Sequence, residues 1–260
     1  MNRHVLNVFC LLVYAFLMAP ILIVVGASLN AGNFLTFPPQ GISLRWYFVF
    51  FDNEVFLRAI RTSVYVATVS TAVSAVIGTA AAIWYVRHAG RWREPARLAM
   101  LSPLLLPEVL TAIALVFFFY NIGIGTKTMS GLIMGHVLMT LPFVFLNVAA
   151  AMESYDESWD MAARSLGAGR WTRFRRVTLP LIKPGVIGGC LFAFIISFDI
   201  FTISLLLKPI GEATLPLQIF DYLRTNFTPE AAAVSTVSII LTVGVVLLSE
   251  KVFGLRIRRF

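Results

Sequence analysis

Residues 160–180 decide the fold of this chain, and they read Asp-Met-Ala-Ala-Arg-Ser-Leu-Gly-Ala-Gly-Arg-Trp-Thr-Arg-Phe-Arg-Arg-Val-Thr-Leu-Pro. The segment is too charged to cross a bilayer, and its residue types predict two short helices. Ser158 is expected to cap the first helix, and Gly167 is a natural stop after Leu166. A second helix is expected from about Arg170. The pattern predicts two helices joined by an exposed elbow.

Composition places the rest of the chain in a membrane. Of 260 residues, 58% are hydrophobic and only 13% are charged, which is more apolar surface than a soluble domain of this length could cover. The net charge of +8 is spread over short basic runs between apolar stretches, so it indicates membrane topology and not a nucleic-acid partner.

Apolar runs of about 20 residues predict an all-α membrane protein with six transmembrane helices. The expected spans are roughly 5–27, 62–86, 98–120, 131–152, 185–207 and 231–253. Pro103 and Pro107 are expected to disturb the third. We expect one transmembrane domain over residues 1–260, with a cytoplasmic loop at 153–184.

The distribution of basic residues predicts the orientation of these spans. Fifteen of the 21 lysines and arginines fall near the N-terminus, in the second and fourth loops or near the C-terminus. The positive-inside rule therefore predicts that both termini and these two loops are cytoplasmic. The third and fifth loops, and the long first loop at 28–61, then face outward.

Two further stretches predict local packing. The aromatic-rich residues 43–56 in the first outer loop are expected to form an amphipathic helix at the membrane interface. Ser74, Gly78 and Ala82 form a row of small residues in the second span. This row predicts close helix packing, either within the chain or at a subunit interface.

The sequence offers no catalytic or metal-binding motif. Cys10 and Cys190 lie far apart in apolar segments, so packing roles are expected for both. His88 and His136 have no second ligand at helical spacing, so interfacial or packing roles are expected for them. No phosphate-binding loop for ATP is present. We therefore expect this chain not to be an enzyme and to bind no cofactor of its own.

Two acidic residues lie well inside apolar spans, away from the span ends. Glu108 follows Pro107 in the third span, and Asp199 lies in the fifth. An uncompensated carboxylate in a bilayer is costly, so both residues are candidates for a solute pathway that accepts cations. The alternative for each is a structural hydrogen bond or an ion pair with a partner subunit.

The cytoplasmic segment resembles the signature of permeases in type I ATP-binding-cassette importers. That signature reads Glu-Ala-Ala, three residues, Gly, nine residues, Ile, one residue, Leu-Pro. Ala162, Ala163, Gly167 and Leu179-Pro180 match it at the right spacing, while Met161 replaces the Glu and Val177 the Ile. Pro38 to Tyr47 also resemble a stretch of the family's first outer loop.

This resemblance implies a MetI-like permease fold in the bacterial inner (plasma) membrane. It also implies a second homologous permease, two ATPase subunits that use ATP and Mg²⁺, and an extracytoplasmic solute-binding protein. The residues that the resemblance places in the ATPase-coupling segment are Asp160, Met161, Ala162, Ala163, Arg164, Ser165, Leu166, Gly167, Trp171 and Phe174.

The second half of the chain resembles the spermidine/putrescine subgroup, through Ser197-Phe198-Asp199, residues 214–219 and Pro229-Glu230. This likeness suggests a cationic solute and adds Phe198 to the candidate pathway. Ile200 stands where the subgroup commonly has a second acid, which leaves room for another amine, an opine or an aminophosphonate. An ion-driven secondary transporter is a further alternative, although no internal repeat supports it.

Overall fold

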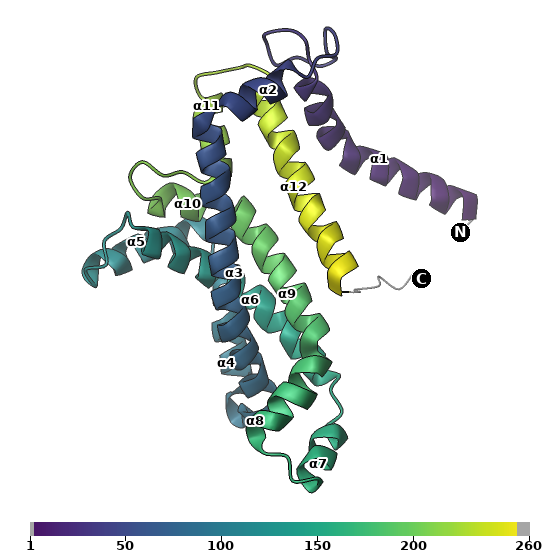
Figure 1. The fold of residues 1–260 in the computed structure, drawn as a ribbon, viewed down its shortest axis with the longest axis vertical. Coiled ribbons are helices and arrows are strands. Elements are labelled where there is room, and N and C mark those ends of the chain that lie inside the picture. Colours follow the sequence, from purple (N-terminus) through teal and green to yellow (C-terminus); the bar gives the residue numbers. More distant parts are fainter. Residues whose placement is uncertain (1–2, 254–260) are drawn as a thin grey trace. The chain divides into compact units, whose positions relative to one another are not determined.

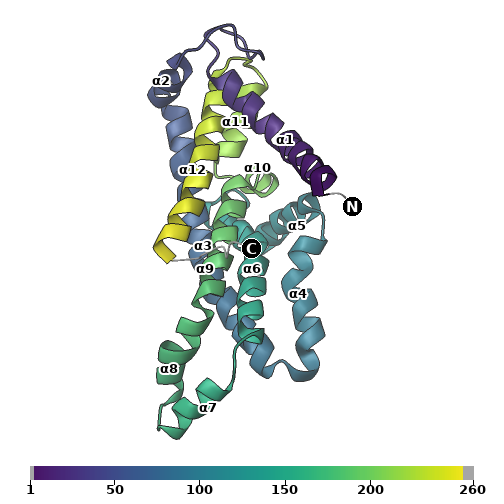
Figure 2. The ribbon, with the colours of Figure 1, turned by 90° about the vertical axis from the view of Figure 1, so that its right-hand side faces the viewer.

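The protein is described here by a computed structural model that covers residues 3–253, with side chains to residue 251 (Figures 1 and 2). Within this range the regular elements are helices, apart from one isolated β-bridge between Asn30 and Ile42. The chain is therefore all-helical, as predicted. Arg256, Arg258 and Arg259, which contributed to the predicted orientation, lie outside the described residues.

The helices follow one another along almost the whole described chain. In order they are α1 (Arg3–Ser28), α2 (Arg45–Asp52), α3 (Glu54–His88), η1 (Gly90–Trp92), α4 (Arg93–Leu105), α5 (Glu108–Asn121), α6 (Met129–Glu153), α7 (Ser158–Ser165), α8 (Arg170–Arg173), η2 (Phe174–Thr178), α9 (Leu179–Asp199), α10 (Thr202–Leu207), α11 (Leu215–Leu223) and α12 (Glu230–Phe253).

Five of the described helical stretches are long and apolar enough to cross a membrane, and the count is six if α4 and α5 form one broken span. The expected spans at 5–27, 131–152 and 231–253 agree closely with α1, α6 and α12, whereas α3 is much longer than 62–86. The six-span count and the cytoplasmic termini stay predictions.

Two expected spans are not single helices. The span predicted at 98–120 is broken between α4 and α5, whose axes differ by 102°. Pro107 causes this break, because a proline forces the preceding residue into an extended conformation, and Leu106 has φ −92° and ψ 145°. The span predicted at 185–207 ends at Asp199, and α10 follows after two residues.

The described residues divide into two compact units, one formed by 3–59 with 217–244 and the other by 60–216 with 245–253. In the second unit, α6 is the central helix and packs along α9. Val144, Val148 and Ile182 are fully buried in this core, together with Ala82 of α3.

Glycines allow α9 to approach α6 closely. A Cβ atom at Gly185 would lie 2.6 Å from Ala151 Cβ and 2.7 Å from the backbone oxygen of Asn147. A Cβ atom at Gly189 would lie 2.8 Å from Val144 Cα. Since no larger residue fits at either position, this glycine pair sets the distance between the two helix backbones.

The small-residue row of the second span also faces α6. Ser74 Oγ lies 2.8 Å from Thr140 Oγ1, and a Cβ atom at Gly78 would lie 2.9 Å from Val144 Cβ. Ala82 is fully buried beside Val144. The row therefore serves packing within the chain, which was one of the two expected roles.

The other unit is held together by polar contacts of its loops. Trp46 Nε1 of α2 donates to the backbone oxygen of Asn30 at 3.0 Å. The Glu230 carboxylate at the start of α12 accepts hydrogen bonds from Asn53 Nδ2 at 2.8 Å and from the Tyr222 hydroxyl at 2.7 Å. The predicted helix of the first outer loop is present as α2, although it ends at Asp52 and not at residue 56.

Candidate functional site

The segment from Asp156 to Pro180 forms the predicted pair of short helices. The first helix, α7, begins at Ser158, one residue before the expected start. The predicted Ser158 cap is wrong, because the Asp156 carboxylate accepts the Ser158 backbone N–H at 2.8 Å and Ser158 makes no side-chain cap. This hydrogen bond to the charged form lowers the pKa of Asp156.

Gly167 forms the elbow between the two helices with φ +81°, a left-handed conformation that favours glycine. The Gly167 N–H donates to the Arg164 carbonyl at 2.9 Å, and the Ala168 N–H donates to the Ala163 carbonyl at 3.0 Å. These two bonds make a Schellman ending and satisfy carbonyls at the end of α7. The stop after Leu166 is therefore as predicted.

The second short helix continues into a membrane-spanning helix. Helix α8 begins at Arg170, as expected, and is followed without a break by the π-helical turn η2 and by α9. The Trp171 and Phe174 rings lie 5.5 Å apart. π-Helical turns recur at functional sites. Because α8, η2 and α9 are continuous, a displacement of α8 would also move α9.

An ion pair fixes α7 against α8 across the elbow. Asp160 Oδ2 lies 3.1 Å from Arg173 Nη1, and both side chains are about one-fifth exposed. Met161, at the position of the signature Glu, points out of the core with 63% of its surface exposed. Asp160, the acid next to the signature position, is therefore paired within the chain and stabilises the arrangement of α7 and α8.

Large apolar side chains are exposed on this otherwise charged segment. Trp159, Met161, Leu166 and Trp171 are 60%, 63%, 88% and 70% exposed, respectively. The other exposed residues of the segment are Ala162, Arg164, Ser165 and Gly167. Three residues are half-buried, namely Asp160, Ala163 and Phe174. Exposed apolar side chains in such number are typical of an interaction surface.

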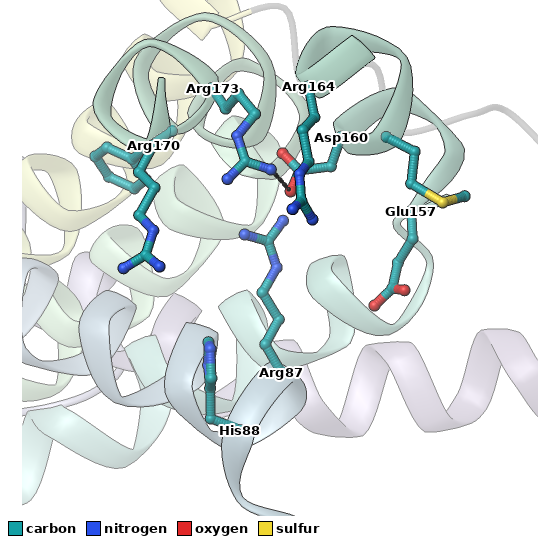
Figure 3. Close-up of a pocket in the computed structure, with 9 residues that line it drawn as sticks. Arg87, His88, Glu157, Asp160, Arg164, Arg170 and Arg173 are labelled. Carbon is teal, nitrogen blue, oxygen red and sulfur yellow. Dashed lines mark hydrogen bonds and ion pairs between the residues drawn. The ribbon is translucent and has the colours of Figure 1, made fainter. Parts of the chain in front are cut away.

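A basic pocket of about 560 Å³ lies beside the segment (Figure 3). Its lining residues are Arg87, His88, Glu157, Asp160, Met161, Arg164, Arg170, Arg173 and Phe174. Arg87, at the end of α3, donates to Thr178 Oγ1 at 3.2 Å and lies over the Tyr155 ring. Sequence reasoning did not predict this pocket, because only the fold brings the end of α3 to the elbow.

The two candidate pathway carboxylates both lie at helix breaks. Glu108 is the first residue of α5, is half-buried, and its buried Oε1 has no hydrogen-bond partner among the described residues. Asp199 is the last residue of α9 and is exposed. Phe198 is only 3% exposed and stacks on Phe194, so its side chain packs within the chain. Helix α5 packs against α10, which follows Asp199.

A buried histidine fixes the break that follows Asp199. His136 of α6 is fully buried and contacts Ser197 Oγ at 2.8 Å through Nδ1 and Ser204 Oγ at 3.1 Å through Nε2. Because the Ser204 hydroxyl donates to the Ile200 carbonyl, it accepts from Nε2, and Nδ1 then accepts from Ser197. The expected packing role of His136 therefore includes a bridge between α9 and α10.

Comparisons with known proteins agree with this architecture. The spermidine/putrescine transport system permease protein PotC of Haemophilus influenzae is 32% identical over 252 residues, which cover 96% of this chain and 97% of PotC. The putrescine transport system permease protein PotI of Escherichia coli is 32% identical over 246 residues, covering 92% and 86% of the two chains.

A solved structure shows the same fold. A chain of the bacterial alginate ABC transporter, in complex with an alginate pentasaccharide-bound periplasmic protein, matches with a TM-score of 0.75 at 17% identity and covers 99% of this chain and 94% of that one. Residues 74–259 match the family described as binding-protein-dependent transport system inner membrane component. The chain belongs to that family and is a membrane permease subunit of an ABC importer.

Proposed function

We propose that this subunit forms half of the translocation pathway for a small cationic solute of the spermidine/putrescine type. The observation that carries the proposal is the position of Glu108 and Asp199, two carboxylates at breaks in otherwise apolar helices. Neither has a salt-bridge partner among the described residues.

An unpaired carboxylate within a membrane is retained where it faces a cavity or meets a cation. Asp199 is exposed on the single chain, so it is available to a pathway shared with a second subunit. The helix breaks at Leu106 and Ile200 also leave backbone carbonyls outside regular helix, and carbonyl oxygens bind ammonium groups well.

The relatives support the same solute class without deciding it. Two relatives at 32% identity are named for spermidine and putrescine transport. The same fold also serves a transporter of alginate, so the fold alone does not select the solute. The carboxylates therefore support a cation, and an amine other than spermidine or putrescine satisfies the same chemistry.

The segment from Asp160 to Phe174 is proposed to couple this subunit to an ATPase. Its exposed apolar residues supply a docking surface, and the Asp160–Arg173 pair holds that surface in shape. In this proposal ATP and Mg²⁺ are bound by the two ATPase subunits, and a sister permease and an extracytoplasmic binding protein complete the importer.

Uptake measurements with charge-neutral variants test the solute proposal. Asp199→Asn keeps the size of the side chain and removes the charge. Pairing of a carboxylate with a cation about 4 Å away contributes several kcal/mol outside bulk water, so we expect putrescine and spermidine uptake to fall at least tenfold. Glu108→Gln is expected to act in the same direction.

The matched control is Glu94→Gln, which removes an exposed carboxylate from α4 in the same unit and should leave uptake unchanged. All variants are expressed with the sister permease, the ATPases and the binding protein, and the amount of assembled complex is measured. Parental uptake by Asp199→Asn at both limiting and saturating solute would remove Asp199 from the pathway.

A further inference from the structure

The basic pocket beside the elbow carries more positive than negative charge. Four arginines line it, against the carboxylates of Glu157 and Asp160. Figure 3 shows the guanidinium groups of Arg87, Arg164 and Arg173 pointing toward Asp160, whereas the carboxylate of Glu157 points away from them. One carboxylate therefore faces three cations.

The hydrogen-bonding groups of the pocket are also incompletely used. Arg173 Nε is a buried donor that has no hydrogen-bond partner among the described residues, whereas Asp160 Oδ1, also without a partner, is an acceptor and does not bind an anion. Arg164 and Arg170 are exposed and make no ion pair there. The single Asp160 carboxylate does not neutralise the converging guanidinium groups, and phosphate oxygens match the geometry of such groups.

A second cavity begins where the basic pocket ends. It is an apolar groove of about 720 Å³ along α3 and α9, lined by residues such as Val76, Ala80, Ile83 and Trp84. His88 and Phe174 line both the groove and the basic pocket, so the two lie next to each other. Both lie within one compact unit of the fold.

We infer that this composite site binds an anionic phospholipid, with its phosphate in the basic pocket and an acyl chain in the apolar groove. A free phosphate would leave the groove unfilled, and an apolar ligand would leave Arg164 and Arg170 unpaired. The predicted orientation puts the pocket at the cytoplasmic leaflet, where basic pockets between helices meet anionic headgroups. Trp84, at the groove, is a residue type typical of the membrane interface.

Lipid titration of the purified importer complex tests this site, with palmitoyl-oleoyl phosphatidylglycerol as the probe and native mass spectrometry as the readout. Arg164→Gln with Arg170→Gln removes two unpaired cations of the pocket. One basic residue near an anionic surface typically raises lipid affinity about fivefold, so the loss of both arginines should weaken phosphatidylglycerol binding about 30-fold. Phosphatidylcholine of the same chains should bind weakly to the parent.

The matched control is Arg175→Gln with Arg176→Gln, which removes two exposed cations of the adjacent turn that do not line the pocket. This double variant should bind phosphatidylglycerol as the parent does. Equal weakening by both double variants would show a general attraction of a basic surface to anionic lipid, and would overturn the site.

A substitution in the groove distinguishes lipid from a free anion. Ala80→Trp fills the exposed groove and should weaken phosphatidylglycerol binding, while binding of inorganic phosphate stays unchanged. Phosphate binding together with unaltered lipid binding in Ala80→Trp would assign the pocket to a free anion.

Two other results would also overturn the lipid site. Release of the sister permease by Ala80→Trp would assign the groove to a subunit interface. Loss of ATPase binding by the Arg164/Arg170 variant, with lipid binding retained, would assign the pocket to an acidic group of the ATPase. Neither result bears on the proposed solute role, and a loss of ATPase binding would itself support the proposed coupling role of residues 160–174.

Discussion

The elbow at Gly167 permits a direct test of coupling through the substitution Gly167→Val. With φ +81°, this position lies where a residue other than glycine costs roughly 1–2 kcal/mol, and a β-branched residue is at the upper end. The strain is conformational only, because no heavy atom lies within 4 Å of a Cβ placed there.

The chain can relieve this strain only by opening the turn. Opening would break the bonds from Gly167 N–H to Arg164 and from Ala168 N–H to Ala163, at 2.9 and 3.0 Å, each of which contributes about 1 kcal/mol. Either route disfavours the docking shape by about 1–2 kcal/mol. Affinity for the ATPase should therefore fall roughly 5- to 30-fold.

The assay measures ATPase binding and solute-stimulated ATP hydrolysis in the purified complex. Gly211→Val is a closely matched control, because Gly211 also has φ +81° and open space around it but lies in the loop between α10 and α11. Gly167→Asn should be milder than Gly167→Val, since asparagine tolerates this conformation better. If Gly167→Val and Gly211→Val bind and stimulate the ATPase equally well, the coupling role of the elbow is refuted.

Two other predictions concern packing around α6. Gly185→Ala should destabilise the fold by about 1–3 kcal/mol, because the new Cβ atom meets backbone 2.7 Å away, whereas Gly244→Ala in open space should not lower the melting temperature. His136→Leu should cost roughly 1–3 kcal/mol in unfolding measurements, because two buried serine hydroxyls lose their shared partner, and an unchanged midpoint would contradict the bridge.

The sequence predicted those features that depend on local chemistry. The lengths of the apolar runs identified α1, α6 and α12 within a few residues, because a helix that crosses a bilayer of given thickness needs a fixed number of apolar residues. Gly167 was identified because few other residues end a helix in a left-handed conformation. Pro107 predicted a disturbance between α4 and α5, but the angle of 102° between these helices was not predicted.

Features that depend on distant residues escaped prediction. The break after Asp199 contains neither proline nor glycine, and it is bridged by His136, some 60 positions away. The Asp160–Arg173 pair needs the elbow to bring two helices together, so sequence spacing does not reveal it. Ser158 and Asp156 are both good capping residues, and only the start of α7 decides between them.

The position of α9 connects the two proposed sites. Its 21 residues run from the end of the coupling segment to Asp199, a distance of about 30 Å at 1.5 Å per residue. Between these ends, Gly185 and Gly189 place α9 against α6 at backbone contact, where the helix can tilt but not move closer. A tilt imposed at α8 would therefore displace Asp199 in the opposite direction, as a lever does about a fixed contact. On this hypothesis Gly185→Ala lowers solute-coupled uptake beyond its effect on the amount of complex, and uptake that follows complex amount alone would restrict the glycine to packing.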